Sequence, residues 1–275
     1  MHETLIVDSV NTLAERISDG AKIALFKDNG VPMELGRALL RRKIKDLHIV
    51  TVPTGGILPD LLIGAGCVAT VETAGISLGE FGLAPRFIAA VKAGDIVVLD
   101  ATCPAIYAGL QAAEKGIPFM PLRGIIGSDI LVHRPQFKII ENPFADSDPI
   151  VALPAIQPDV SLFHAPLADR HGNIFIARQA ELRLMAHAAK STYVTIEKIV
   201  DFNLLEDETY APACLNALYV DGIAVAPRGA WPLNLPGHYE IDTPRIKAYA
   251  ALAQTAAGFN DWLVEHVNHS ANVAA

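Results

Sequence analysis

The first ~120 residues alternate between short apolar runs and longer amphipathic stretches, and this alternation limits the possible folds. The apolar runs predict strands at residues 21–26, 46–52, 67–75 and 95–100. The amphipathic stretches predict helices at residues 9–20, 32–43, 58–66, 84–94 and 103–116. Strands that alternate with helices in this way predict βαβ units. We therefore expect an α/β fold, with an open, largely parallel sheet and helices on both faces.

The second half of the chain resumes this pattern after an interruption. Residues 123–158 are rich in proline and polar turns, so we expect an excursion over the surface there. Further strands are predicted at residues 159–168, 174–177 and 192–200, and further helices at residues 180–190 and 243–267. We expect a single domain over residues 1–275, in which residues 1–8 and 268–275 form loose termini.

The composition argues against several classes of function. The net charge is −8, from 22 Lys and Arg against 30 Asp and Glu, without a basic stripe, so nucleic-acid binding is not expected. No apolar stretch reaches the ~20 residues that span a bilayer, and the first residues do not form a signal peptide. Three widely spaced cysteines without a C-x-x-C pair indicate a reducing compartment. We therefore expect a cytoplasmic protein without a membrane segment.

The candidate site lies where the predicted parallel strands end. Open parallel sheets bind ligands outside the carboxyl ends of their strands. In this chain those ends lead into the loops 26–32, 53–59, 75–85 and 100–104. The first three loops carry glycines, which let the backbone approach a ligand closely. Three such loops at one sheet edge predict a binding site there.

The third loop, within "TVETAGISLGEFGLAPRF" (residues 70–87), contains two overlapping catalytic patterns. The G-x-S-x-G spacing around Ser77 is that of a nucleophile elbow, and Asp100 and His164 could follow as acid and base. An elbow serine is followed at once by a helix, whereas the next helix signal here is Pro85, so a serine hydrolase is disfavoured. Glu80 stands in an E-x-G spacing, which frames the nucleophilic glutamate of one class of acyl-transfer enzyme.

Other motifs do not indicate a metal or a resident cofactor. His266 and His269 lack the H-E-x-x-H spacing of a zinc site, and His171 belongs to a predicted turn. The G-x-G at residues 64–66 precedes a predicted strand, and its third glycine is out of place for a dinucleotide fingerprint. We expect no metal and no permanently bound cofactor.

Several segments, in this order and spacing, resemble one family over roughly residues 9 to 265. They are "LLRRKIKDLHIVT", "LLIGAGCVATVE", "GLQAAEKGIPFMPLRGIIGSDI", "IIENPF", "VALPAIQPDVSLFHA", "ADRHGN" and "DGIAVAPRGAWP...HYEID". Together they resemble the α (A) subunits of family I CoA-transferases, and most closely the glutaconate CoA-transferase A-subunit group. The resemblance implies a two-chain enzyme, in which this chain pairs with a homologous β subunit in a heterodimer, an α2β2 assembly or a larger one.

The resemblance also implies a chemistry with coenzyme A as a substrate. A glutamate of the partner β chain would attack an acyl-CoA thioester, form an acyl–glutamyl anhydride, and then carry CoA as a glutamyl thioester to a carboxylic acid. Some relatives instead hydrolyse, decarboxylate or cleave C–C bonds in CoA esters, so these activities remain alternatives. A non-catalytic subunit is the third interpretation, because the Gly-Gly-Phe that usually follows the first strand of α chains is replaced by "ALFKDNGVP".

No nucleophile is expected in this chain, and Glu80 is predicted to be the counterpart of the glutamate on the partner. The predicted pocket residues share the ends of the first three parallel strands. They are Phe26, Lys27, Asn29, Thr54, Gly55, Gly56, Ser77 and Glu80.

Overall fold

The computed structural model describes residues 4–27 and 29–267. Their central element is a ten-stranded sheet, in which the eight strands of the main path all run parallel. From edge to edge this path is β1 (Leu5–Val7), β13 (Gly222–Val225), β11 (Ser191–Val200), β9 (Val160–Asp169), β2 (Lys22–Phe26), β3 (Leu47–Val52), β4 (Val68–Thr73) and β5 (Val97–Asp100). Two short strands, β10 (Ile174–Phe175) and β12 (Cys214–Leu215), add an antiparallel extension.

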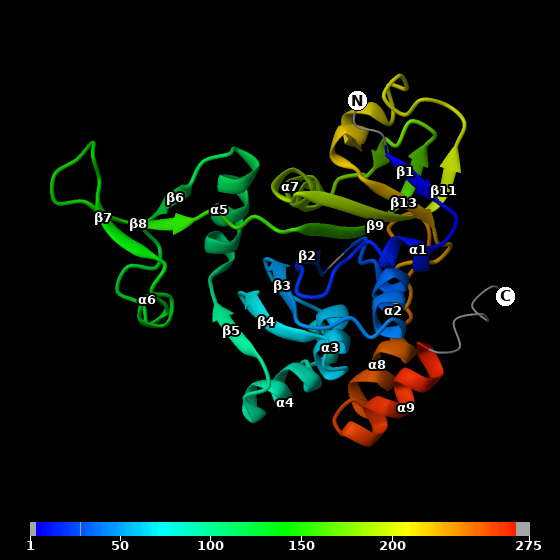
Figure 1. The fold of residues 1–275 in the computed structure, drawn as a ribbon, viewed down its shortest axis with the longest axis horizontal. Coiled ribbons are helices and arrows are strands. Elements are labelled where there is room, and N and C mark those ends of the chain that lie inside the picture. The colour runs from blue at the N-terminus through cyan, green and yellow to red at the C-terminus, as the bar shows by residue number, and fades with distance from the viewer. Residues whose placement is uncertain (1–3, 28, 268–275) are drawn as a thin grey trace.

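Helices cover both faces of the sheet, because alternate strand residues point to opposite sides. On β2, Ile23 and Leu25 join one hydrophobic cluster, whereas Ala24 and Phe26 join another. The first cluster includes residues of α1 (Val10–Ala14), α2 (Met33–Arg41), α3 (Ile57–Gly64), α4 (Pro85–Ala93), α8 (Thr243–Leu252) and α9 (Ala256–His266). The second includes residues of α5 (Cys103–Glu114) and α7 (Ala180–Ala188), which Figure 1 shows across the strands from α3, α8 and α9. The predicted α/β architecture is confirmed.

Residues 123–158, expected to be an irregular excursion, form most of a second small sheet with the preceding strand. This antiparallel sheet has the order β6 (Phe119–Leu122), β8 (Pro149–Pro154) and β7 (Lys138–Glu141), and it carries α6 (Ile130–His133). In Figure 1 it projects to one side of the central sheet. The Arg134 guanidinium fastens it to the body, because it donates to Glu72 Oε1 at 2.5 Å and to the Asp100 carbonyl at 2.8 Å.

Two predictions about the ends of the chain need correction. The N-terminus is not loose over residues 5–7, since β1 pairs in parallel with β13. The single helix expected over residues 243–267 is broken into α8 and α9, because the Thr255 side chain accepts from the Gly258 N–H and starts a new helix. Residues 1–3 and 268–275 lie outside the described part. Within residues 4–27 and 29–267, every helix is too short or too polar to span a lipid bilayer.

Candidate active site

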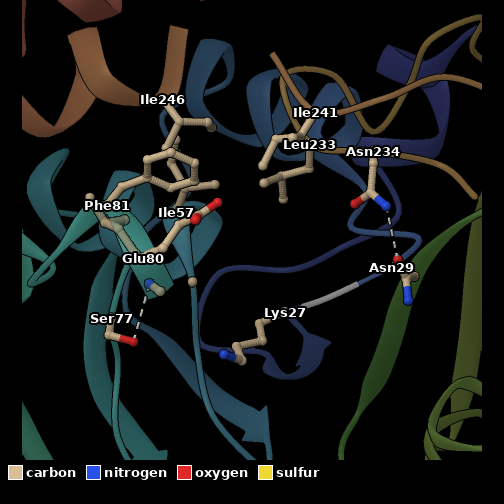
Figure 2. A pocket seen from close by; sticks show the side chains of 13 residues that line it. Lys27, Asn29, Ile57, Ser77, Glu80, Phe81, Leu233, Asn234, Ile241 and Ile246 are labelled. Carbon is tan, nitrogen blue, oxygen red and sulfur yellow. Dashed lines mark hydrogen bonds between the residues drawn. The ribbon is translucent and has the colours of Figure 1, made fainter. Parts of the chain in front are cut away.

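A cavity of about 260 Å³ opens at the carboxyl edge of the central sheet. One side of it comes from the loops that follow β2, β3 and β4, and the other side from the segment between β13 and α8 together with Ile246 of α8 (Figure 2). The lining residues are Lys27, Asn29, Gly56, Ile57, Ser77, Leu78, Gly79, Glu80, Phe81, Leu233, Asn234, Ile241 and Ile246. The cavity therefore lies where the topology predicts a ligand site.

The loops after β3 and β4 are joined to each other, which fixes the floor of the cavity. The Gly55 N–H donates to the Gly75 carbonyl at 2.8 Å, and the Ser77 N–H donates to the Gly55 carbonyl at 3.0 Å. These bonds continue the parallel pairing beyond the strand ends. A Cβ on Gly55 would lie 2.9 Å from side-chain atoms of Ile76 and Thr51, so only glycine fits there without a shift. The two loops thus form one connected platform.

The backbone conformation of this platform explains why a glycine stands two residues after Glu80 in the E-x-G spacing. Glu80 is the middle residue of a short 3-10 helix, Gly79–Phe81, and Gly82 follows it with φ +105° and ψ −156°. Residues with a Cβ rarely adopt that backbone conformation, because the side chain clashes with the backbone. The glycine of the E-x-G spacing, Gly82, is therefore required by the backbone geometry alone. The Leu78 N–H closes the loop on the Gly82 carbonyl at 2.8 Å. The exposed Glu80 carboxylate then points into the cavity, as Figure 2 shows.

The opposite side of the cavity comes from residues that the sequence did not predict. Leu233, Ile241 and Ile246 contribute apolar side chains. Asn234 joins the two sides, because its amide donates to Asn29 Oδ1 at 3.3 Å. Buried Arg37 holds this segment by donating to the Trp231 carbonyl at 2.5 Å. The sequence signal in this region was "DGIAVAPRGAWP" with the following "HYEID", which supported the resemblance without indicating a pocket.

A second polar group lies near the cavity, and we call its members His164, Thr195, Glu197 and Tyr239 the His164 cluster. The two ring nitrogens of His164 lie 2.9 Å from Thr195 Oγ1 and 2.8 Å from Glu197 Oε1. The Tyr239 hydroxyl donates to Glu197 Oε1 at 2.9 Å, and the Arg228 N–H donates to Glu197 Oε2 at 2.9 Å. The cluster thus ties β9 and β11 to the segment that walls the cavity.

Burial decides the charges in the His164 cluster. It lowers the pKa of His164 below its usual 6.5, although Glu197 beside it acts in the opposite direction. Burial alone would raise the pKa of Glu197, but the hydrogen bonds from His164 and the Arg228 N–H outweigh it and hold that pKa below its usual range. A neutral imidazole that donates from Nε2 and accepts at Nδ1 satisfies both partners.

The positions of Ser77 and His164 argue against the serine-hydrolase interpretation. His164 is bonded to Thr195 and Glu197, and no histidine is among the described residues that line the cavity with Ser77. The Ser77 hydroxyl accepts from the Gly79 N–H at 3.4 Å, as part of its own loop. As expected from the sequence, the next helix begins only at Pro85.

The structure brings five of the predicted pocket residues together. Lys27, Asn29, Gly56, Ser77 and Glu80 line the cavity.

The other three predicted residues are not among its lining residues. Phe26 packs in the second hydrophobic cluster, because it points to the opposite face of the sheet from Leu25. Gly55 is buried in the platform, and half-buried Thr54 precedes it.

The chemistry of the cavity suits an organic anion or ester better than a metal. It offers an ammonium, two amides, a hydroxyl and one carboxylate beside a wall of aliphatic and aromatic carbon. Throughout residues 4–27 and 29–267, no three His, Cys, Asp or Glu side chains are grouped as metal ligands. His266 contacts the Trp262 carbonyl and Arg245, and His269 lies beyond the described range.

Comparison with known proteins gives a consistent picture. Residues 7–226 match the family model for Coenzyme A transferase. A 3-oxoadipate CoA-transferase chain from Pseudomonas knackmussii is 31% identical over 91% of this chain and 89% of its own length. The cholesterol ring-cleaving hydrolase IpdA subunit of Rhodococcus jostii is also 31% identical, over 87% of this chain and 83% of its own. An Archaeoglobus fulgidus protein is 29% identical over 95% of this chain, which spans 60% of that longer protein.

Solved structures extend the similarity to the whole architecture. Glutaconate CoA-transferase from Acidaminococcus fermentans superposes with a TM-score of 0.87 and 28% identity, over 96% of this chain and 89% of the other. A variant of the decarboxylase AibA/AibB superposes with a TM-score of 0.85 and 28% identity, over 96% of this chain and 100% of the other. The same fold therefore occurs in proteins named as transferases, a hydrolase and a decarboxylase.

Proposed function

This chain belongs to the coenzyme A transferase family, and from that membership we propose that it is the α subunit of a two-chain enzyme. The enzyme would move CoA between an acyl-CoA and a carboxylic acid. The observation that carries this proposal is the cavity at the carboxyl edge, which has Glu80 on a rigid glycine platform and an apolar wall opposite. Such a cavity can hold the acyl part of a thioester and leave the CoA part outside.

The proposed chemistry places the nucleophile on the partner chain. A partner glutamate attacks the thioester carbonyl, the thiolate of CoA leaves, and an acyl–glutamyl anhydride forms. The thiolate then attacks the glutamyl carbonyl, which releases the first carboxylic acid and leaves CoA on the glutamate as a thioester. An incoming carboxylate reverses these steps, so a new acyl-CoA leaves and the glutamate is restored.

This chain would contribute the binding side of that reaction. The apolar wall excludes water from the acyl group, which protects an anhydride from hydrolysis. Backbone N–H groups of the glycine loops would stabilise the negative oxygen that develops on the carbonyl under attack. Glu80 would orient the acyl group or a neighbouring partner residue.

A second candidate is hydrolysis or decarboxylation of a CoA ester. It is favoured by the carboxylate of Glu80 inside the cavity of this chain, where it could direct a water molecule. The similarity to AibA/AibB and to the IpdA subunit supports the same alternative.

The decisive experiment is to purify the chain together with the protein that co-purifies with it, expected to be a homologous β chain, and to test an acyl-CoA panel with and without carboxylate acceptors. Transfer that needs an acceptor, with CoA trapped on a β-chain glutamate by mass spectrometry, is the expected result. Acceptor-independent release of CoA or of carbon dioxide would favour the second candidate. Turnover by the lone chain would contradict the two-subunit proposal.

A further inference from the structure

His266, near the end of α9, lies in a stack of side chains behind the apolar wall of the cavity. Its ring is stacked on that of Trp262, with 3.7 Å between centroids and 10° between planes, and faces that of Trp231 at 6.4 Å and 22°. Its side chain is only 6% exposed. We call Trp231, Arg245, Trp262 and His266 the Trp231 stack.

We propose that the uncharged His266 ring is a positioning residue, which holds the wall of the cavity in place through Trp231 and releases it when the ring takes up a proton. The inference rests on the proposed function, because it concerns the wall that would receive the acyl group.

Trp231 connects the stack to the segment that forms the wall. Leu233 and Asn234, which line the cavity, follow it two and three positions later. The Trp231 indole N–H donates to Asp242 Oδ2 at 3.0 Å, and the Asp242 N–H donates to the Pro232 carbonyl at 2.9 Å. The indole thus fixes the beginning and the end of this segment to each other.

Arg245 connects His266 to the wall from the side of α8. Its Nη1 donates to His266 Nε2 at 2.7 Å, and its guanidinium lies over the Trp231 ring, 5.6 Å from the centroid. The ring of Trp231 is also covered by the guanidinium of Arg37, at 5.3 Å. The position of the indole therefore depends on contacts from both α2 and α8.

The three aliphatic residues of the wall all stand beside these groups in the sequence. In Figure 2 their side chains lie along one side of the cavity. They are Leu233, two positions after Trp231, Ile241, one before Asp242, and Ile246, one after Arg245. A displacement of the Trp231 stack would therefore reach the whole aliphatic wall.

The hydrogen bonds of His266 require a neutral ring. Its Nδ1 donates to the Trp262 carbonyl at 3.0 Å, so Nδ1 carries the hydrogen. Its Nε2 must accept, because the Arg245 guanidinium has only donors. A proton on Nε2 would place an N–H against an N–H and a cation beside a cation. The Arg245 contact would then be lost.

The charges around the ring favour the neutral form at pH 7. Burial lowers the pKa of His266 below its usual 6.5, and Arg245 and Arg37 act in the same direction, whereas the Trp262 carbonyl and Glu265 oppose them. The Glu265 carboxylate lies 3.5 Å from Nε2 on the exposed side of α9.

α2 brings one more cation close to the end of α9. Arg41 donates to the carbonyl of Val267 at 3.3 Å, and it shares Glu34 with Arg37. The ring should therefore take up a proton only below pH 6.5.

The test follows kcat and KM of the assembled enzyme from pH 7.5 to pH 5, with the acyl-CoA of the panel that the wild type turns over fastest. His266→Phe keeps an uncharged ring but cannot take up a proton, so its KM at pH 7.5 should stay within about threefold of the wild type. Below pH 6.5 the wild-type KM should rise about fivefold or more, and that of His266→Phe should rise less. His164 and Asp60 titrate in both proteins and cancel in the comparison.

His266→Ala removes the ring itself. At pH 7.5 we expect its KM to rise about tenfold, with a smaller change in kcat, because the wall binds the acyl group and does not react with it. The exposed His171→Ala is the matched control and should behave as the wild type. Parallel KM profiles of the wild type and His266→Phe would overturn the proposal.

Two further readouts need no turnover. Trp231 and Trp262 are the two tryptophans of the chain, and a protonated imidazole quenches indole emission. Emission of the wild-type complex should therefore fall below pH 6.5 more than that of His266→Phe in the same complex. At pH 7.5, backbone amides of residues 231–235 should exchange hydrogen faster in His266→Ala than in the wild type, and His266→Phe should keep the protection.

Unchanged exchange in His266→Ala, or equal emission profiles of the wild type and His266→Phe, would overturn the inference. If emission and exchange change as expected but no acyl-CoA is turned over, the inference about the wall is supported, and the result counts against the proposed function alone.

Discussion

Two groups of polar side chains lie near the carboxyl edge of the central sheet, and they differ in what surrounds them. In the His164 cluster, buried His164 and half-buried Glu197 are bonded to each other and to neighbouring side-chain and backbone groups. In the cavity, Glu80 is exposed on a 3-10 turn between two glycines. The pKa values of His164 and Glu197 are both displaced by this burial and bonding.

This difference in surroundings distinguishes side chains that hold the structure from side chains that can contact a substrate. A buried group whose donors and acceptors are all engaged holds the structure, and a substrate would have to break its bonds to use it. An exposed carboxylate on a fixed backbone can meet a substrate without such a cost. From this comparison we propose that the His164 cluster supports the cavity wall, and that Glu80 and Lys27 contact the substrate.

The largest expected effect is on the supporting side. Glu197→Ala removes the acceptor of His164, of the Tyr239 hydroxyl and of the Arg228 N–H. Because it leaves a fully buried imidazole without its partner at Nε2, we expect the free energy of unfolding to fall by about 3 kcal/mol. Urea titration followed by circular dichroism measures it.

The control for this prediction is Glu208→Ala, which removes an exposed carboxylate elsewhere and should change stability by less than about 0.5 kcal/mol. A loss below about 1 kcal/mol for Glu197→Ala would mean that the His164 cluster does not support the cavity wall. The proposed difference in role between the cluster and the cavity residues would then be wrong.

The next effect is on the platform that presents Glu80. Gly82→Ala forces a side chain onto a residue at φ +105°, so we expect a loss of about 2 kcal/mol and a clear fall in the activity of the assembled enzyme. Gly124→Ala is the matched control, because a Cβ there meets no atom within 4 Å and its φ is ordinary. Equal behaviour of the two variants in unfolding and turnover would show that the E-x-G spacing has no backbone requirement.

The sequence predicted the platform side of the cavity better than the wall. Alternating strands and helices place three glycine loops at one edge, and this local pattern was enough to indicate Lys27, Asn29, Gly56, Ser77 and Glu80. It did not separate Phe26 from Lys27, although a period of two residues sends them to opposite sides of the sheet. The wall comes from residues 233–246, more than 150 residues beyond the last platform loop, and no local pattern records that packing.

The errors in the fold have a similar cause. β1 has three residues, and its pairing depends on β13, which lies more than 200 residues further along the chain. The small antiparallel sheet is built from strands of four to six residues among prolines, which a local pattern assigns to turns. The break between α8 and α9 depends on a single cap at Thr255, which an apolar period hides.

A smaller decrease in the free energy of unfolding is expected when the pH is lowered, and we expect the His164 cluster to cause it. The pKa of His164 is lower in the folded chain than its usual 6.5, so the unfolded chain takes up the proton first as the pH falls. Stability that is present above pH 6.5 is then lost on acidification, and Glu197, with its lowered pKa, adds to the loss at still lower pH. Unfolding free energies measured from pH 7.5 to pH 5 should therefore decrease.

The variant His164→Asn isolates this contribution. It lacks the titrating ring, so its stability should depend less steeply on pH than that of the wild type over the same range. Asp60 acts in the opposite direction in both proteins, because burial raises its pKa to about 6, and it cancels in the comparison. Identical slopes in the two proteins would remove the His164 ring as the source.

The smallest effect on the free energy of unfolding is expected for a substitution of Glu80 in the cavity. Glu80→Gln exchanges an exposed carboxylate for an amide of the same shape, so the free energy of unfolding should change by less than about 0.5 kcal/mol. Activity of the assembled enzyme should fall modestly, on the order of tenfold, because in the proposed function Glu80 positions the substrate and the nucleophile belongs to the partner. Covalent capture of CoA, followed by mass spectrometry of trapped enzyme, should persist. If Glu80→Gln abolishes all capture, Glu80 is itself the nucleophile, and the reaction is then carried by this chain and not by its partner.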